Sequence, residues 1–300
     1  MKRRSVAIVG MGGIGGVVAG CLRDADRVDV IGCGKVPLDH LVVERPEGTV
    51  DVPLRTLADP ASAHVVDWVL LATKAHQTAS TAPWLARLCG PGTRVATLQN
   101  GIAHAQRVAP FAGPARVVPA IVYYNGERLA PDRVRLRHAG QYDLAVADDA
   151  DGRDFAALLE GTPLRVMLAA DVGTLFWRKL LLNVVANPLT ALTLRRQEVL
   201  RRDDMQQLGL ALLREAVAVA RADGAQLADD EPERALATLL TYPPDAGTSM
   251  YFDRLAGRSF EVDALTGAVV DAGERLGVPT PLNRAMLTLL HALEEAPPAT

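Results

Sequence analysis

A glycine-rich segment near the N-terminus constrains the fold of this chain more than any other feature. The segment follows an apolar run, residues 5–10, and opens a helix-compatible stretch, residues 14–24. A strand, a G-x-G-x-x-G turn and a helix in this order are typical of dinucleotide-binding βαβ units, whose pyrophosphate lies at the helix N-terminus. We therefore predict dinucleotide contacts from Gly10, Met11, Gly12, Gly13, Ile14 and Gly15. The alternative is an ordinary glycine-rich tight turn.

Short apolar runs continue through the first half of the chain and predict further strands over residues 28–31, 67–72, 93–98 and 117–122. Helix-compatible stretches, residues 77–88 and 102–109, lie between them. This alternation predicts a mostly parallel sheet covered on both faces. Pro119 places the last strand near an edge or at a bulge. Residues 131–147 alternate in polarity and predict antiparallel strands at the end of the sheet.

The second half of the chain changes character. From about Asp171 the strand pattern gives way to helical periodicity, as in Met205, Leu208, Leu212, Ala216 and Val219. We expect Thr280 to cap a helix with Pro281 in its first turn, and residues 296–300 to be a frayed tail. The predicted fold class is α/β, with an N-terminal Rossmann-type doubly wound domain over residues 1–170. An all-α substrate and catalytic domain follows over residues 171–300.

Composition limits the partners that this chain can have. Its 32 basic and 35 acidic side chains give a formal net charge of -3, which does not provide the basic field that nucleic acid or an anionic membrane requires. No run of about 20 apolar residues suggests a membrane span. Cys21, Cys33 and Cys89 lack C-x-x-C spacing, which favours reduced thiols and a cytoplasmic protein. The six histidines show no metal-ligand spacing, and no G-x-S-x-G elbow points to hydrolysis.

The end of the second predicted strand bears on which dinucleotide binds. An acid about 20 residues after the glycines would hold the ribose of NAD, whereas a basic residue would suit the 2′-phosphate of NADP. The chain reads Ile31-Gly-Cys33-Gly-Lys35 there, and Asp29 lies inside the strand. Small residues beside Lys35 favour NADP, with NAD as the alternative. The other interpretation of Lys35 is a solvated surface lysine.

The most informative segment of the second half is residues 176–188. Lys179, Asn183 and Asn187 recur every four residues and share one face of a helix that is otherwise apolar. A buried helix with such a stripe predicts a wall that binds carbonyl and hydroxyl groups. We expect Pro188 to kink the helix and turn the amide of Asn187. The alternative is that Lys179 pairs with an acid and the amides satisfy helix ends.

Four further positions are candidates for the site. Glu261 is either the partner of a catalytic lysine or the first-turn acid of the helix that follows. Ser249 either binds a substrate carboxylate or caps a helix. Asn100 and Lys74 end predicted strands, where ligands of open α/β sheets bind, although Asn100-Gly101 is also a common turn dipeptide.

Taken together, these segments resemble the ketopantoate reductase (2-dehydropantoate 2-reductase) family over nearly the whole chain. The resemblance rests on the glycine loop, on Lys74 in Thr-Lys-Ala-His-Gln-Thr and on Leu98-Gln-Asn-Gly101. More specific are Trp177-Arg-Lys-Leu with Asn183 and Asn187-Pro-Leu-Thr-Ala-Leu192, Ser249-Met with Asp253, and Gly257-Arg with Glu261-Val-Asp-Ala.

The resemblance implies a Rossmann domain, an all-helical domain and an active site in the cleft between them. It implies NADPH-dependent reduction of 2-dehydropantoate to pantoate, in the route to pantothenate and coenzyme A. Lys179 would be the general acid and Glu261 would tune it. The substrate would be oriented by Asn100, Asn183, Asn187 and Ser249, and Lys74 would lie near the nicotinamide, with Asn100 also facing the cofactor.

The chain departs from this family at two points. Cys33 stands where members commonly carry an arginine, and Asp245-Ala-Gly-Thr248 replaces a loop that often supplies a polar substrate contact. The resemblance still implies a small 2-oxo acid as the partner, most simply 2-dehydropantoate. The alternatives are reduction of another 2-oxo acid or ketone, and a non-catalytic dinucleotide-binding sensor. Apolar faces in the helical half are compatible with a homodimer.

Overall fold

The computed structural model describes residues 3–295, which form two compact units, one ending at Val172 and the other beginning at Gly173. Within the described residues, all strands belong to the first unit, and the second consists of helices and turns. The predicted fold class is therefore confirmed. The predicted frayed tail, residues 296–300, lies outside the described residues.

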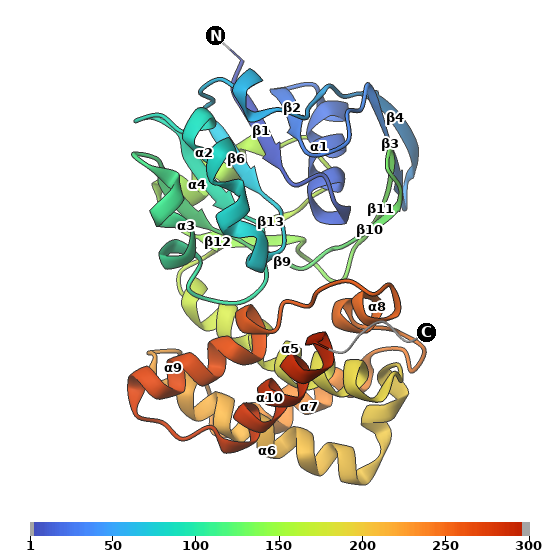
Figure 1. Ribbon diagram of the computed structural model, residues 1–300, viewed down its shortest axis with the longest axis vertical. Helices are drawn as coiled ribbons and strands as arrows, with labels where there is room; N and C mark the ends of the chain where they lie inside the picture. The colour runs from blue at the N-terminus through green and yellow to red at the C-terminus, as the bar shows by residue number, and fades with distance from the viewer. Residues whose placement is uncertain (1–2, 296–300) are drawn as a thin grey trace. The chain divides into compact units, whose positions relative to one another are not determined.

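A six-stranded parallel sheet forms the centre of the first unit (Figure 1). Its order is β5-β2-β1-β6-β7-β8, and each neighbouring pair is parallel. The strands are β1 (Ser5–Val9), β2 (Asp29–Cys33), β5 (Thr56–Leu57), β6 (Trp68–Leu71), β7 (Arg94–Thr97) and β8 (Arg116–Pro119). The strand order reverses between β1 and β6, which makes their carboxyl ends the expected ligand-binding edge.

Helices cover both faces of this sheet because successive strand residues point to opposite sides. Val6 and Ile8 join a core with α1 (Gly13–Ala25) and α4 (Ala150–Leu158). Ala7 and Val9 join a second core with α2 (Ala82–Leu88) and α3 (His104–Ala112). Near-continuous apolar strands therefore correspond to a sheet that is buried on both faces.

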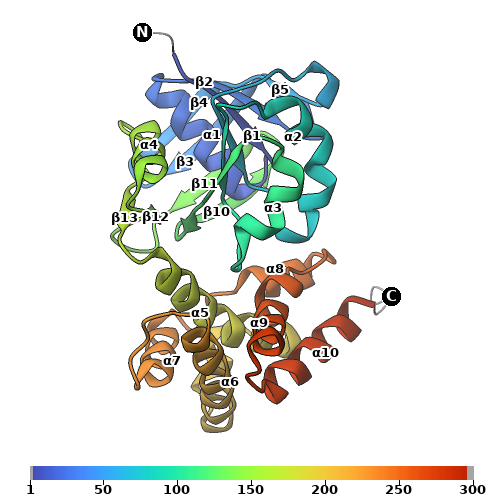
Figure 2. The ribbon, with the colours of Figure 1, turned by 90° about the vertical axis from the view of Figure 1, so that its left-hand side faces the viewer.

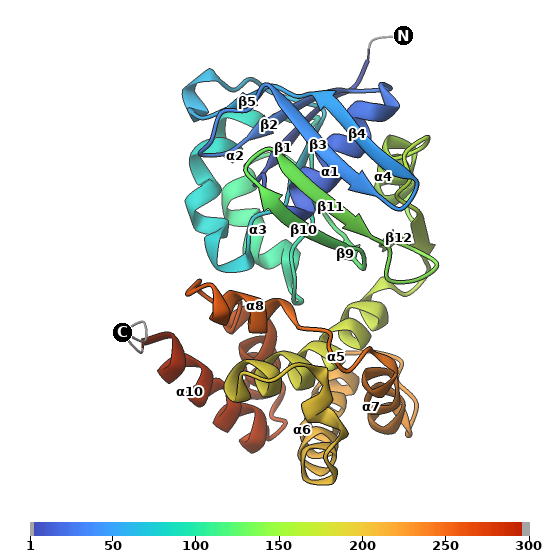
Figure 3. The same ribbon diagram turned by 90° about the vertical axis from the view of Figure 1, so that its right-hand side faces the viewer.

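A second sheet packs on the side of α1 away from the parallel sheet (Figure 3). Its order is β10 (Asn125–Ala130), β11 (Arg133–Arg137), β3 (His40–Arg45) and β4 (Gly48–Pro53). Glycines on one face of α1 permit this approach: a Cβ on Gly13 would lie 1.9 Å from the Gly126 carbonyl oxygen, and one on Gly20 would lie 2.2 Å from Cγ2 of Val43. Sequence analysis did not predict this sheet.

Three local predictions need correction. Residues 131–147 do not form antiparallel strands at the end of the main sheet: β11 lies in the second sheet, and β12 (Leu144–Ala147) lies between β9 (Ile121–Val122) and β13 (Val166–Ala169). The run 117–122 splits into β8 and β9, with Pro119 ending an edge strand as predicted. The stretch 77–88 begins as a 3₁₀ segment, Ala75–Thr81, before α2, where proline favours the first helical turn. A short 3₁₀ turn, Pro60–Ser62, precedes β6.

The second unit is a set of packed helices (Figure 2). They are α5 (Val172–Thr193), α6 (Asp203–Ala222), α7 (Glu231–Thr241), α8 (Ser249–Leu255), α9 (Ala268–Leu276) and α10 (Pro281–Glu295). A 3₁₀ segment, Gln197–Arg201, precedes α6, and a π-helical turn, Asp263–Gly267, leads into α9. Helix α6 packs against α7, α9 and α10.

The apolar periodicity of α6 and the predicted start of the last helix are confirmed. Leu212, Ala216 and Val219 are buried on one face of α6. Helix α10 begins at Pro281 directly after Thr280. The Glu215 carboxylate of α6 accepts hydrogen bonds of 2.9 Å from the amides of Leu282 and Asn283, so a carboxylate satisfies the first-turn donors of α10.

Because α1 lies so close to the second sheet, adding one methyl group at Gly13 should lower the stability of the protein. We expect Gly13→Ala to lower the free energy of unfolding by about 1–3 kcal/mol, because the new Cβ meets a backbone oxygen that cannot rotate away. Thermal and denaturant unfolding measure this loss. The matched control is Gly92→Ala, which meets no atom within 4 Å and should change stability by less than about 0.5 kcal/mol. Equal stability of the two variants would contradict the packing argument.

Candidate active site

The glycine turn after β1 has the geometry that the motif requires. Gly10 has φ +102°, and a Cβ there would lie 2.7 Å from the Thr73 amide nitrogen. A Cβ on Gly15 would lie 1.9 Å from the carbonyl oxygen of Gly10. The first and third glycines are therefore needed for the turn and for close packing of α1 on the sheet.

The second glycine differs from the other two. Gly12 precedes α1, provides no side-chain cap, and a Cβ on it would meet nothing within 4 Å. The first turn of α1 also lacks acidic residues. The helix N-terminus therefore has space and no competing carboxylate, which suits the pyrophosphate of a dinucleotide.

The other loop residues are held by their neighbours. The Met11 side chain lies against Gly32 and Gly34. A Cβ added to Gly32 would lie 3.0 Å from Sδ of Met11, and one added to Gly34 would lie 3.5 Å from Cβ of Met11. The Ile14 carbonyl oxygen accepts a 2.8 Å hydrogen bond from the Tyr124 hydroxyl. Tyr124 is buried, so this bond ties the start of α1 to the chain just before β10.

The end of β2 separates two residues that sequence analysis considered together. Cys33 is 1% exposed and packs in the core beside α2 and α3, where burial raises the pKa of its thiol to about 12. Lys35, two residues further on, is exposed. The side chain at position 33 is therefore buried in the core, and Lys35 is an exposed cation near this strand end.

Two loops with predicted site residues follow β6 and β7, which are neighbours in the sheet. Lys74 precedes the 3₁₀ segment and Asn100 follows β7, and both are partly buried. Gly101, with φ +92°, makes the turn after Asn100. Because Gly10 packs on Thr73, the loop containing Lys74 lies next to the glycine turn.

Sequence analysis missed the residues that connect these loops. Gln99 is 4% exposed, and its Nε2 donates to the hydroxyls of Thr78 (3.0 Å) and Thr73 (3.3 Å). Arg107 donates to the Gln99 side chain and to the Asn100 carbonyl. Gln99 belongs to the Leu98-Gln-Asn-Gly101 motif, but the only sequence feature that indicated its role is that a polar residue follows a buried strand.

The polar stripe of the second unit lies on α5. Lys179 and Asn183 are partly buried, Asn187 is 3% exposed, and most other residues of the central turns are buried. The helix continues through Pro188 to Thr193, and the kink expected at Pro188 stays a prediction. The Thr190 hydroxyl donates 2.7 Å to the Ala186 carbonyl in the turn that contains the proline. The predicted stripe thus exists on one continuous buried helix.

Lys179 and Glu261 interact electrostatically. Glu261 is 8% exposed, in the segment before the π-helical turn, whose own first-turn acid is Asp263. Glu261 is therefore not the first-turn acid of the following helix. Burial lowers the pKa of Lys179 to about 8, while attraction to Glu261 raises it. The effect of desolvation on the pKa is the larger of the two, so the amine can exchange a proton near neutral pH.

The start of α8 corrects one interpretation of Ser249. Thr248 is the cap, since its hydroxyl accepts from the Tyr251 amide at 3.1 Å, and Ser249 occupies the first helical position with an exposed side chain. The Thr248 hydroxyl also lies 2.7 Å from that of Thr190 on α5. This bond brings Ser249 close to the carboxyl-terminal half of α5, while Asp253 pairs with Arg258 at 3.0 Å.

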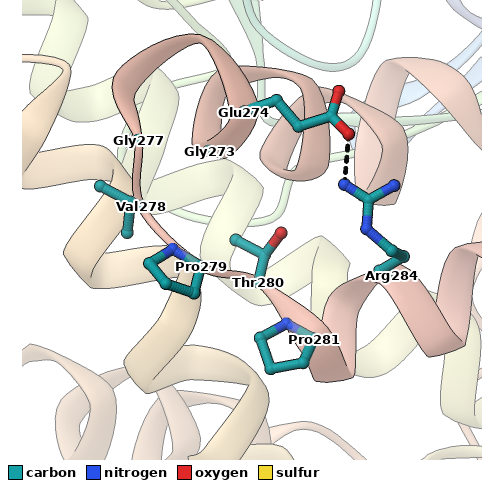
Figure 4. A pocket seen from close by; sticks show the side chains of 8 residues that line it. All are labelled: Gly273, Glu274, Gly277, Val278, Pro279, Thr280, Pro281 and Arg284. Carbon is teal, nitrogen blue, oxygen red and sulfur yellow. Dashed lines mark hydrogen bonds and ion pairs between the residues drawn. The ribbon is translucent and has the colours of Figure 1, made fainter.

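A surface pocket elsewhere in the second unit contains none of the predicted site residues. It lies between the end of α9 and the start of α10, where Glu274 pairs with Arg284 (Figure 4). Its lining residues are Gly273, Glu274, Gly277, Val278, Pro279, Thr280, Pro281 and Arg284. Over residues 3–295, no helix combines the length and apolarity of a membrane span, and no three His, Cys, Asp or Glu side chains cluster as metal ligands.

Comparison with known families decides the assignment. Residues 6–149 match the family described as Ketopantoate reductase PanE/ApbA, and residues 171–294 match Ketopantoate reductase PanE/ApbA C terminal. The chain belongs to the ketopantoate reductase family. The resemblance inferred from the sequence motifs is confirmed.

Individual relatives agree with this assignment to the ketopantoate reductase family. The chain is 39% identical to a 2-dehydropantoate 2-reductase of Caulobacter vibrioides, covering 96% of this chain and 98% of that protein. A PanE/ApbA family ketopantoate reductase from Ralstonia eutropha JMP134 superposes with a TM-score of 0.87 at 29% identity, covering 97% and 98% of the two chains. A dimeric ketopantoate reductase from Staphylococcus aureus has a TM-score of 0.86 at 25% identity, with coverages of 97% and 99%.

The opposing influences on Lys179 make a prediction that needs no assumption about substrate. Glu261→Gln removes the attraction that favours the ammonium, so the pKa of Lys179 should fall below about 8. The chain has four lysines, so NMR titration of ¹³C-labelled lysine Cε signals can follow each one. Glu233→Gln, which alters an exposed pair with Arg214, should leave the Lys179 titration unchanged. An unchanged or raised pKa in Glu261→Gln would refute the predicted interaction.

Proposed function

We propose that this protein reduces 2-dehydropantoate to pantoate with NADPH, the reaction of the route to pantothenate and coenzyme A. The observation that carries the proposal is a partly buried lysine whose pKa falls to about 8 near a buried glutamate, in a member of the ketopantoate reductase family. Reduction of a ketone needs a hydride donor and an acid that delivers a proton to the carbonyl oxygen. A lysine with a pKa near 8 can serve as that acid.

The first unit fits a nicotinamide dinucleotide. Gly12 leaves open space at the uncapped N-terminus of α1, where backbone N–H groups would hold the pyrophosphate. Exposed Lys35 would meet the 2′-phosphate of NADPH, and Lys74 and Asn100 would lie near the nicotinamide end. When bound, NADPH supplies the hydride that adds to the carbonyl carbon of the substrate.

Lys179 supplies the proton in this proposal. Its Nζ–H donates to the ketone oxygen, and the proton passes to that oxygen as negative charge develops there. The product is the alcohol, and the neutral amine regains a proton from solvent. Glu261 keeps enough of the lysine protonated at neutral pH, because its charge opposes the effect of burial.

Amide and hydroxyl groups orient the substrate in the same proposal. Asn183 and Asn187 offer donors and acceptors at one-turn intervals after Lys179, and Ser249 offers a hydroxyl and a backbone N–H in the first turn of α8. Asn100 completes the set. These groups suit the hydroxyl and carboxylate of a 2-oxo acid and fix the carbonyl relative to the lysine.

The assembly that we propose is a homodimer. The support is the dimeric ketopantoate reductase of Staphylococcus aureus, whose fold covers nearly all of this chain. Exposed apolar side chains of the second unit, Phe252, Leu255 and Leu289, are available to such an interface. We further propose that the protein acts in the cytoplasm on a small-molecule substrate and binds neither nucleic acid nor membrane.

Loss of Lys179 tests the chemistry. We expect Lys179→Ala to lower kcat for NADPH oxidation with 2-dehydropantoate by about 10²–10⁴-fold, the usual contribution of a positioned general acid. In wild type, kcat/KM should fall as pH rises through about 8, because deprotonation removes the acid. Absorbance at 340 nm measures both. Arg214→Ala, an exposed change on α6, is the control. A wild-type protein inactive with every 2-oxo acid tested would refute the proposed function.

Lys35 tests the cofactor preference separately. If its ammonium meets the 2′-phosphate, Lys35→Ala should weaken NADPH binding about 10-fold, the value of a charge-assisted hydrogen bond at an exposed position. NADH binding should stay the same, because NADH lacks that phosphate. Quenching of intrinsic tryptophan fluorescence gives both dissociation constants. Equal losses for the two cofactors would assign Lys35 a different role.

A further inference from the structure

A hydrogen-bond network joins the loops that follow β6 and β7. Both loops contain predicted site residues, Lys74 in the first and Asn100 in the second. The network centres on Gln99 and Arg107, neither of which has a role in the reaction proposed above. Its position at the carboxyl ends of neighbouring parallel strands is the expected ligand-binding edge of the sheet.

Gln99 connects the two loops through its side-chain amide. Its Nε2 donates to the Thr78 hydroxyl at 3.0 Å and to the Thr73 hydroxyl at 3.3 Å, and both threonines lie in the loop that contains Lys74. Thr73 in turn packs against Gly10 of the dinucleotide turn. A buried amide thus links the Asn100 loop to the Lys74 loop and the glycine turn.

Arg107 on α3 fixes this amide and the backbone around Asn100. Its Nε donates to Oε1 of Gln99 at 3.3 Å, and its two terminal nitrogens donate to the carbonyls of Asn100 (3.2 Å) and Ile102 (3.3 Å). A guanidinium has only donors, so the Gln99 atom facing it must be the carbonyl oxygen. The amide nitrogen is then directed to the threonines.

The segment that Arg107 holds leads into one strained residue. Ala103 has φ +57°, a left-handed conformation that its side chain disfavours, whereas Gly101, with φ +92°, adopts positive φ readily. The buried His104 Nε2 lies 3.1 Å from the backbone carbonyl oxygen of Gln99 and supports the same segment. Strained backbone persists only where its surroundings over-determine it, and such sites concentrate at ligand-binding positions.

We propose that Arg107 is a positioning residue for Asn100 and, through Gln99, for the loop that contains Lys74. One of its donors binds the Asn100 carbonyl, and the other two bind the Gln99 side chain and the Ile102 carbonyl on either side. Together they hold this segment so that the Asn100 side chain is directed to cofactor and substrate before either binds. The proposal rests on the function proposed above, because it assigns Asn100 a part in that reaction.

A double-mutant cycle between Arg107 and Asn100 tests this role. We expect Arg107→Ala to lower kcat/KM for NADPH-dependent reduction of 2-dehydropantoate by about 10–100-fold, since small misplacements of a reacting group have effects of this size. If Arg107 acts through Asn100, adding it to Asn100→Ala should lower kcat/KM by less than about 3-fold more. Fully multiplicative losses, or a single variant as active as wild type, would overturn the proposal.

Controls separate positioning from general stability. Arg94 lies at the opposite end of β7 and forms ion pairs with Asp151 and Asp154. Arg94→Ala breaks these pairs, so it should alter thermal unfolding without a comparable loss of kcat/KM. If Arg107→Ala does not fold, Arg107→Lys replaces it in the cycle. One ammonium cannot reach three separated acceptors, so a smaller but equally non-additive loss is expected. Additive behaviour of the lysine variant would overturn the proposal in the same way.

Failure of this proposal is distinguishable from failure of the proposed function. Wild-type protein without turnover on any 2-oxo acid refutes the function, whatever the variants do. The cycle is then measured on NADPH dissociation constants, where non-additivity between Arg107→Ala and Asn100→Ala is still expected. An active wild type with independent effects of the two substitutions refutes only the positioning role.

Discussion

The close approach of α1 to backbone on two sides is the constraint on which the first unit depends. Gly15 lets the helix contact the Gly10 carbonyl on the side of the parallel sheet, and Gly13 lets it contact the Gly126 backbone on the other. A methyl group at either position would lie 1.9 Å from a backbone oxygen. The helix N-terminus, with its uncapped N–H groups and the open space at Gly12, is therefore fixed by main-chain packing and does not depend on a ligand for its position.

The protonation of Lys179 in the second unit depends on a balance between burial and attraction to Glu261. Burial lowers the pKa of Lys179 and attraction to Glu261 raises it, and the outcome is a pKa of about 8. Three of the four lysines in the chain, Lys35, Lys74 and Lys179, are candidate site residues, although arginine is the common cation elsewhere. Arginine cannot lose its proton in a protein, so it could bind a carbonyl oxygen at position 179 but could not protonate it.

The sequence predicted the main sheet and the helical unit because both depend on local periodicity. Most strands of the parallel sheet are short apolar runs, although the two-residue edge strand β5 was not predicted. Helix α6 repeats its apolar face every turn. The second sheet was not predicted, because the pairing of β3 with β11 joins residues about 90 positions apart, and alternation does not specify a partner. Lys179, Asn183 and Asn187 were found from their spacing on one helix. Gln99 and Arg107 act through contacts between loops, and no periodicity marks such contacts.

The N-terminal cap of α8 likewise depends on a contact between distant segments, which local sequence does not reveal. Sequence analysis considered only Ser249 as a cap, whereas the Thr248 hydroxyl caps the helix and also bonds to Thr190 on α5. The preceding loop is held through its backbone, since Pro244 and Ala246 carbonyls accept from the amides of Glu198 and Gln197 at 2.8 and 3.0 Å. A loop held by main-chain bonds can exchange side chains without changing its path. Thr248 lacks this freedom, because its side chain caps α8 and bonds to Thr190. In the proposed reaction, substitutions at Asp245 and Ala246 are therefore expected to alter the preference among 2-oxo acids while the start of α8 keeps its position.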